Sequence, residues 1–250
     1  MCCYLFCGVI VDKQFKVKLI VRRVNALASL SWFKQSWAIF MQAPLVWVLM
    51  FITLGVVAML SQLHPLTAIV GILLNPFLTA GVYKSVVAVQ QKQSIQFVNL
   101  FQPLQETACR AVFIRIAALN MLASIPLSVL AAELLEQHQQ QAVSGALMLL
   151  FVIGFLLTWM VFAYAVAIAY FLQERRLLAI MQASFIACWR NITALVVFGL
   201  LSMGLIMLTM PTLFIGLLLV IPLLNIAFFL SFNEFFALQV KPTDEAVLEV

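Results

Sequence analysis

Six apolar stretches, each about as long as a membrane is thick, dominate this sequence. A bilayer core of about 30 Å needs about 20 apolar residues in a helix. The stretches that meet this length are Pro44–Leu63, Leu66–Val89, Val112–Leu135, Ala142–Leu172, Ile192–Met210 and Thr212–Leu238. Only helices and closed barrels satisfy backbone amides in lipid, and these runs lack the alternation of barrel strands. The sequence therefore predicts an all-α, polytopic membrane helix bundle with six transmembrane helices.

The composition excludes the soluble classes of protein. Of the 250 residues, 65% are hydrophobic and only 9% are charged, whereas a soluble domain carries about 25% charged residues. So few charges cannot cover a surface that faces water. An ordinary globular enzyme, a disordered protein and a disulfide-stapled secreted module are therefore excluded.

The basic residues predict the orientation of the bundle. All 14 Lys and Arg residues precede the first stretch, follow the sixth, or lie near the connections between stretches two and three and stretches four and five. The connections on the other side, 61–65, 136–141 and 210–211, carry no basic residue. Basic residues stay in the cytoplasm. We therefore expect both termini of the bundle to be cytoplasmic.

Three regions follow from this division. Residues 1–24 are a basic segment that we expect either to lie at the membrane interface or to reflect an over-long start-site assignment. Residues 25–240 are a single six-helix transmembrane domain, and residues 241–250 are a cytoplasmic tail. Basic residues beside a bilayer are attracted to anionic headgroups. The expected partners are thus the lipid bilayer and its anionic headgroups at the cytoplasmic face, with no nucleic acid; a membrane protein partner or a homo-oligomer stays open.

The two halves of the chain resemble each other, which predicts two parallel internal repeats, A (about 28–89) and B (about 176–238). The spacing Leu30, Phe33, Trp37, Phe40 recurs as Leu178, Met181, Phe185, Cys188, and the pair Pro65, Pro76 recurs as Pro211, Pro222. Each repeat is expected to begin with an amphipathic lead-in helix on the cytoplasmic face, and Ile95–Leu104 to form a third such element that ends at Pro103. Aromatic side chains sit at headgroup level, so the expected interfacial anchors are Trp32, Trp37, Trp47 and Trp189.

Polar residues beside the mid-helix prolines are the candidate site, because hydrocarbon makes polar groups costly. Asn75, Pro76 and Thr79 lie in the second stretch, and Pro222 and Asn225 lie in the sixth. Each proline frees the carbonyl four residues earlier, here those of Ile72 and Leu218. One interpretation is a small polar binding site or pathway where the two kinks converge. The other is that the amides satisfy the freed carbonyls and clamp helix pairs; Asn120 and Ser124, near Pro126, are open to the same two interpretations.

No combination of residues suggests catalysis, so we expect no enzyme, no cofactor and no metal. The two histidines, His64 and His138, fall in different loops, and the five cysteines form no Cys-x-x-Cys pair. No carboxylate lies at a predicted bilayer centre, which disfavours an ion-driven carrier. Lys84 and Glu234, near the cytoplasmic ends of the proline-broken stretches, are expected to reach for the headgroups rather than to pair.

Four blocks of the chain resemble successive blocks of an uncharacterised family of proteobacterial six-span inner-membrane proteins. They are SWFKQSWAIFMQAPLVWVLM, LLNPFLTAGVY, VNLFQPL and ASFIACWRNITALVVFGLL. The resemblance covers roughly residues 25–240 and includes a Pro-x-x-x-x-Gly step at Pro76 and Gly81. Ser31 departs from the pattern, since a glycine is expected before the tryptophan. The family has no established activity, so the resemblance implies location and architecture only.

Two roles without covalent chemistry are compatible with these features. The absence of intramembrane charge and the short external loops favour non-catalytic envelope or assembly support. Parallel repeats with paired broken helices favour a small-molecule transporter or permease-like protein, with a polar site between the proline-broken second and sixth helices.

Overall fold

The computed structural model describes residues 21–140, 144–212 and 215–236, and within these ranges all regular structure is helical. The helices are α1 (Ala28–Phe40), α2 (Pro44–Ser61), α3 (Pro65–Gln90), η1 (Phe97–Phe101), α4 (Gln102–Gln105), α5 (Thr107–Gln139), α6 (Gly145–Phe162), α7 (Ala165–Phe171), α8 (Leu177–Arg190), α9 (Ile192–Met207), η2 (Met210–Thr212) and α10 (Leu217–Phe235). The predicted all-α bundle is confirmed. Most of the basic segment, residues 1–20, and the predicted tail 241–250 lie outside the described residues.

Five spans within the described residues are long and apolar enough to cross a membrane. They are α2, α3, α5, the pair α6–α7, and α10. A sixth exists if α8 and α9, which meet at 78°, count as one bent span. By itself α9 has 16 residues, about 24 Å of helix. Leucines such as Leu45 and Leu149 are exposed on the outer faces of the helices, so these faces contact lipid.

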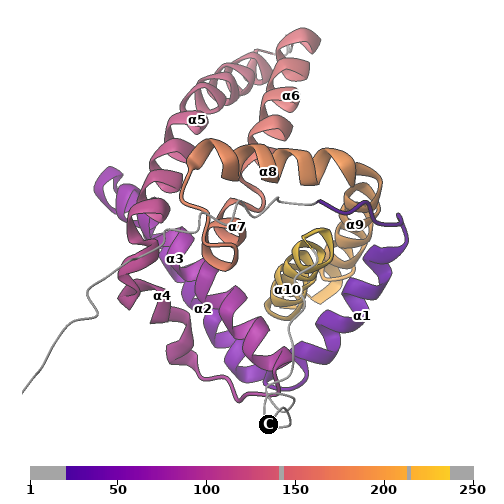
Figure 1. Cartoon of the computed structure of the whole chain (residues 1–250). Helices are drawn as coiled ribbons and strands as arrows, with labels where there is room; N and C mark the ends of the chain where they lie inside the picture. The colour runs from indigo at the N-terminus through magenta and orange to yellow at the C-terminus, as the bar shows by residue number, and fades with distance from the viewer. Residues whose placement is uncertain (1–20, 141–143, 213–214, 237–250) are drawn as a thin grey trace, which may run out of the picture.

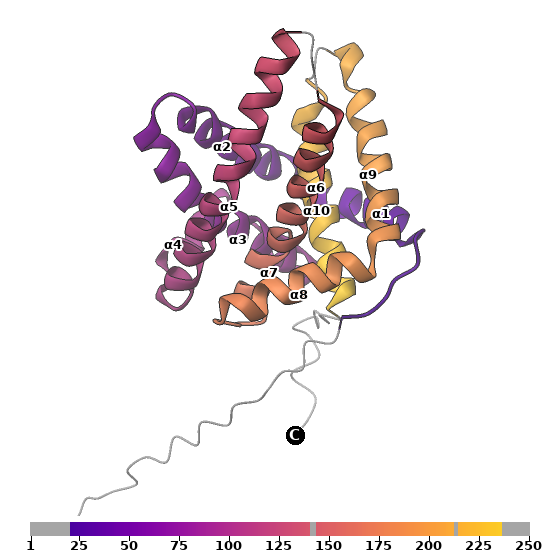
Figure 2. The same cartoon turned by 90° about the horizontal axis from the view of Figure 1, so that it is seen from above.

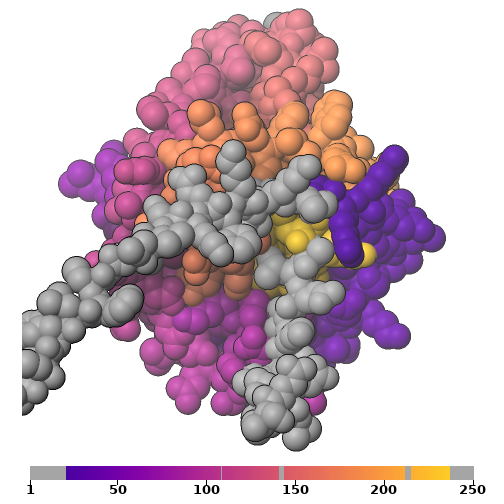
Figure 3. All heavy atoms as spheres, viewed as in Figure 1, coloured from indigo at the N-terminus to yellow at the C-terminus, as the bar shows by residue number. Residues whose placement is uncertain are grey.

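Four helices of the bundle share one general direction, and α8 crosses their ends. Figure 2 shows α5, α6, α9 and α10 running in the same general direction, with α8 lying across their lower ends. The first helix, α1, packs along α10, while α3 contacts α2, η1 and α5 (Figure 1). In the space-filling view, α8 and α1 flank the exposed end of α10 (Figure 3).

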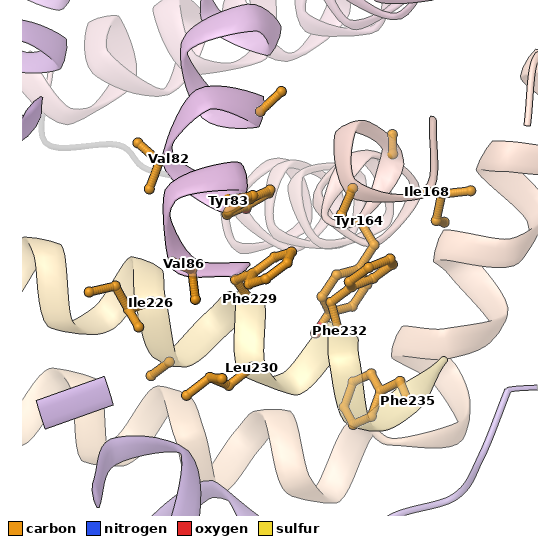
Figure 4. Packing of buried hydrophobic residues seen from close by; sticks show 14 of the residues in the cluster. Val82, Tyr83, Val86, Tyr164, Ile168, Ile226, Phe229, Leu230, Phe232 and Phe235 are labelled. Carbon is orange, nitrogen blue, oxygen red and sulfur yellow. The ribbon is translucent and has the colours of Figure 1, made fainter. Parts of the chain in front are cut away.

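Aromatic rings join α3, α10 and the start of α7 in the core. Tyr83 stacks on Phe229 with ring centroids 4.6 Å apart, and Tyr164 stacks on Phe228 at 4.8 Å. The edge of Phe235 meets the same Tyr164 ring (Figure 4). Stacked and edge-to-face pairs stabilise by about 0.5–1.5 kcal/mol beyond the area they bury. These rings therefore hold the three helices in a single packing arrangement.

The fourth predicted span is not one continuous helix. It breaks at Ala163–Tyr164, between α6 and α7, because a hydroxyl from α8 is inserted into the helix. The Tyr164 amide donates to Ser184 Oγ (3.1 Å), and that hydroxyl donates to the Met160 carbonyl (2.9 Å). In an uninterrupted helix the amide of residue 164 would reach the carbonyl of residue 160 directly. Side-chain insertion of this kind is a recognised cause of helix kinks.

The two lead-in helices, α1 and α8, each bury small residues on one side and expose large apolar residues on another. Ser36 of α1 and Ser184 of α8 are fully buried, whereas Leu30, Trp37 and Leu178, assigned to the apolar faces, are exposed. Small residues let helices approach closely inside a membrane protein. Large apolar side chains need no burial where lipid surrounds them, and other members of the same periodic faces, Phe40 and Cys188, are buried in the protein.

Two further predicted helix boundaries were wrong. The segment Ile95–Leu104 is a 3₁₀ turn, η1, followed by the short helix α4, and Pro103 lies in the first turn of α4 instead of ending a helix. Proline suits the first turn because its missing N–H would have no partner there. The sixth helix begins at Leu217, not at Thr212, since Met210–Thr212 forms η2.

Polar contacts gather the ends of several helices at one end of the bundle. Lys84 Nζ lies 2.8 Å from Glu106 Oε1, which joins α3 to the start of α5. The Arg22 amide donates to the Phe235 carbonyl (2.8 Å) at the end of α10. Glu234 accepts a hydrogen bond from the Trp32 indole. Lys84 and Glu234 therefore do not pair, and each has a partner within the protein rather than reaching only for headgroups.

Candidate polar site beside the proline-broken helices

A recess of about 490 Å³ lies between α2, α3 and α10. Asn75 and Thr79 line it from α3, and Asn225 lines it from α10. Ser61 and Gln62, at the end of α2, line it as well. The structure thus brings three of the five predicted site residues to one place, from two helices that are distant in sequence. Below, this is the first recess.

A second recess, of about 230 Å³, lies on the other side of α3, against α5 and the break between α6 and α7. Asn120 lines it from α5, and Pro76 lines it from α3. Ile72, Asn75 and Thr79 line both recesses. A short stretch of α3 therefore separates two hollows, and its polar side chains are available to both.

The two mid-helix prolines, Pro76 and Pro222, differ in their positions relative to the recesses. Pro76 and Pro222 are buried inside helices that continue past them. Since proline has no N–H, the Ile72 carbonyl in the wall of both recesses loses its usual helical donor. Pro76 thus borders the second recess, whereas Pro222 lines neither recess in the described part of the chain and lies one turn before Asn225.

The polar side chains bond within their own helices. Thr79 Oγ1 donates to Asn75 Oδ1 (3.0 Å), and Asn225 Nδ2 donates to the Ile221 carbonyl (2.9 Å). Neither amide is bonded to the carbonyls freed by proline, which was the second predicted interpretation. No hydrogen bond from Asn75 Nδ2 occurs within the described residues, so this donor is available to a ligand.

The predicted tryptophan anchors divide into two groups. Trp37 and Trp189 are exposed, at 47% and 61%, as a side chain that reaches headgroups must be. Trp32 and Trp47 are buried inside the protein, so the expectation that they are interfacial anchors was wrong for both. Their indole N–H groups have internal acceptors, Glu234 for Trp32 and the Ile39 carbonyl for Trp47 (3.3 Å). A buried tryptophan needs such a partner.

Asn191 is a structurally important residue that the sequence did not indicate. It is fully buried at the corner between α8 and α9. Its Oδ1 accepts from the Val24 amide (2.8 Å), and its Nδ2 donates to the carbonyls of Arg22 and Ala187 (both 3.0 Å). These bonds attach the chain ahead of α1 to the second half of the protein. A lone asparagine at a helix junction gives no sequence signal for such a long-range role.

The chemistry of the recesses is that of uncharged hydrogen bonding. Their polar lining consists of amides, hydroxyls and backbone carbonyls, and no Asp, Glu, Lys or Arg lines either recess in the described part of the chain. Such a lining offers both donors and acceptors to a neutral polar molecule. Comparison with protein-family models, curated proteins and solved structures found no match for this chain.

Proposed function

We propose that this chain is a permease-like protein of a bacterial inner membrane that binds an uncharged, hydrogen-bonding solute beside its proline-containing helices α3 and α10. One observation carries the proposal: Asn75 and Thr79 of α3 share a recess with Asn225 of α10. Polar residues are expensive in a membrane and mark substrate pathways when they face a cavity. A structural clamp would bond them across helices, but their hydrogen bonds stay within each helix.

The second recess supports movement of the solute as well as binding. It shares Ile72, Asn75 and Thr79 with the first, so a molecule held by these residues would be at the boundary between two hollows. The break between α6 and α7 lines this recess, and discontinuous helices beside binding sites are a recurring feature of secondary transporters. The absence of charge from the lining favours a neutral solute over an ion.

An internal duplication is part of the same proposal. Each predicted repeat contains a lead-in helix, an apolar helix and a helix with a buried internal proline, in that order. Tyr83 and Phe229, which correspond in the aligned repeats, stack directly on one another, as residues beside a pseudo-twofold axis would. The lead-in helices pack differently, α1 along α10 and α8 against α6, so the halves have diverged.

The proposed function is tested by removing hydrogen bonding from the shared residues without changing their size. Cells that lack the protein would be given the wild type, Asn75→Leu with Thr79→Val, or Thr53→Val. Thr53 lies in α2 outside both recesses, and its hydroxyl bonds the Leu49 carbonyl (2.9 Å). Uptake and efflux of neutral solutes such as polyols, amides and sugars would be measured. We expect Thr53→Val to restore the wild-type profile and the double variant to fail.

A double variant that restores every wild-type uptake and efflux rate, at equal protein level in the membrane, would contradict the permease-like function. The envelope-support role would then be favoured, because it does not require these polar side chains. Measuring the protein level in the membrane separates loss of the site from loss of the fold.

The proposed orientation has its own test. Basic residues predict that both termini and the connection between α7 and α8 are cytoplasmic. A reporter that is active only outside the cytoplasm is expected to be inactive after Val250 and active when inserted in the connection 136–141. Activity of the fusion after Val250 would reverse the orientation.

A further inference from the structure

A separate cleft of about 370 Å³ opens where the start of α5, the end of α7 and the connection to α8 meet. Glu106, Tyr170, Gln173 and Arg175 line its polar part. Val112, Ala169 and Phe171 are apolar residues of its wall. None of these residues lines either recess beside α3, so the cleft is an independent feature of the molecule.

The negative charge in this cleft is already compensated. Glu106 Oε1 lies 2.8 Å from Lys84 Nζ and accepts a hydrogen bond from the Tyr170 hydroxyl (3.0 Å). A carboxylate with an ion-pair partner and a second donor has little capacity left to attract a cation. The remaining charge of the lining is the guanidinium of Arg175.

Arg175 and its neighbour Arg176 differ in what they bind. The Arg176 guanidinium donates to both carboxylate oxygens of Glu174 (3.1 and 3.2 Å), and these hydrogen bonds lower the pKa of Glu174. The exposed Arg175 guanidinium makes neither an ion pair nor a hydrogen bond within the described ranges of the chain. It therefore keeps its donors available in the cleft.

Two residues of the connection between α7 and α8, Gln173 and Arg175, have side chains that can donate hydrogen bonds in the cleft. Gln173 has a φ of 51°, which lies in the left-handed region that residues other than glycine rarely adopt. Gln173 and Arg175 both line the cleft, while Arg176 does not. Strained residues of this kind cluster at ligand-binding positions.

We propose that this cleft binds a phosphate-bearing anion, either as the headgroup of an anionic lipid or as a free phosphate. The planar guanidinium of Arg175 can donate two parallel hydrogen bonds to phosphate oxygens, and the Gln173 amide can donate another. The apolar wall beside these donors suits the first carbons of an acyl chain. Lys84 pairs with Glu106 of the cleft lining, so the cleft lies on the side of the bundle that the basic residues predict to face the cytoplasmic headgroups.

The test compares two adjacent arginines in the purified full-length protein in a non-ionic detergent. Wild type, Arg175→Gln and Arg176→Gln would be titrated with phosphatidylglycerol, phosphatidylcholine and inorganic phosphate, and the thermal unfolding midpoint would be measured. A ligand that binds only the folded state raises this midpoint. We expect Arg175→Gln to need at least about tenfold more anion for the same rise, and Arg176→Gln to match the wild type.

The arms of the titration separate the two sources. A response to phosphatidylglycerol alone supports a lipid headgroup, and a response to inorganic phosphate as well supports a free phosphate. Equal responses of the two arginine variants to every probe would overturn the site. So would a wild-type response to phosphatidylcholine as strong as that to phosphatidylglycerol, because a zwitterionic lipid lacks the net charge that Arg175 would recognise.

Discussion

Replacing Gly81 with alanine is expected to destabilise the protein by about 1–3 kcal/mol, the usual cost of forcing extra atoms into a packed core. A Cβ at this position would lie 2.1 Å from the Leu100 carbonyl oxygen and 2.7 Å from its carbonyl carbon. These are backbone atoms of η1, and Leu100 itself is fully buried. Rotating a side chain therefore cannot relieve the clash, and η1 must separate from α3.

Two other glycines provide matched controls for this change. A Cβ at Gly55 in α2 or at Gly199 in α9 meets no atom within 4 Å. Alanine at these positions should be neutral or stabilise by up to about 1 kcal/mol, because glycine is a poor helix former. The thermal unfolding midpoint of each variant in the same detergent is the measurement. An unfolding midpoint for Gly81→Ala equal to that of the controls would show that η1 does not rest on α3.

Replacing Ser184 with alanine is expected to cost about 1–3 kcal/mol, since the buried Tyr164 amide loses its acceptor and the Met160 carbonyl keeps only the weak Cys188 Sγ donor (3.7 Å). The Ser184 hydroxyl joins the Tyr164 amide to the Met160 carbonyl, and Ser184 is fully buried. The amide of Tyr164 should consequently exchange its hydrogen faster in the variant, which mass spectrometry of the exchanged protein can detect.

Ser202→Ala in α9 is the control for Ser184→Ala in α8. The Ser202 hydroxyl donates to the Phe198 carbonyl of its own helix (2.7 Å), and its removal leaves the helical hydrogen bonds in place. Its unfolding midpoint should stay within about 0.5 kcal/mol of the wild type, as for most changes away from special features. Unchanged stability of Ser184→Ala, with slower exchange at Tyr164, would mean that α6 and α7 had merged into one helix.

Two separate sequence motifs meet at Gly81. The Pro-x-x-x-x-Gly step and the block VNLFQPL were noted as separate motifs, and the structure places Leu100 of the second motif against Gly81 of the first. A glycine inside a predicted helix often marks a close approach of another backbone. Which backbone approaches it cannot be derived from the pattern, because the contact depends on how the connection after α3 folds back.

The candidate site was also only partly predictable, because the sequence marks its residues but not the helix that packs beside them. Asn75, Thr79 and Asn225 could be identified because polar residues beside prolines are unusual in apolar runs. Their convergence on one recess required the packing of α10 against α2 and α3. Which residues of α1 and α8 are buried could not be derived from periodicity, because in lipid both faces of a helix can be apolar.

The sequence by itself determined that this protein is an all-α bundle of membrane-length helices, because apolar length and missing charge are properties of each segment alone. It also determined where prolines and polar groups interrupt those helices. Only the tertiary structure decided that Ser184 interrupts the helix of the fourth span and that Trp32 and Trp47 are buried. It also decided that Arg175 lines a cleft while Arg176 does not. Those outcomes depend on contacts between residues far apart in the chain, and no local pattern encodes the identity of a distant partner.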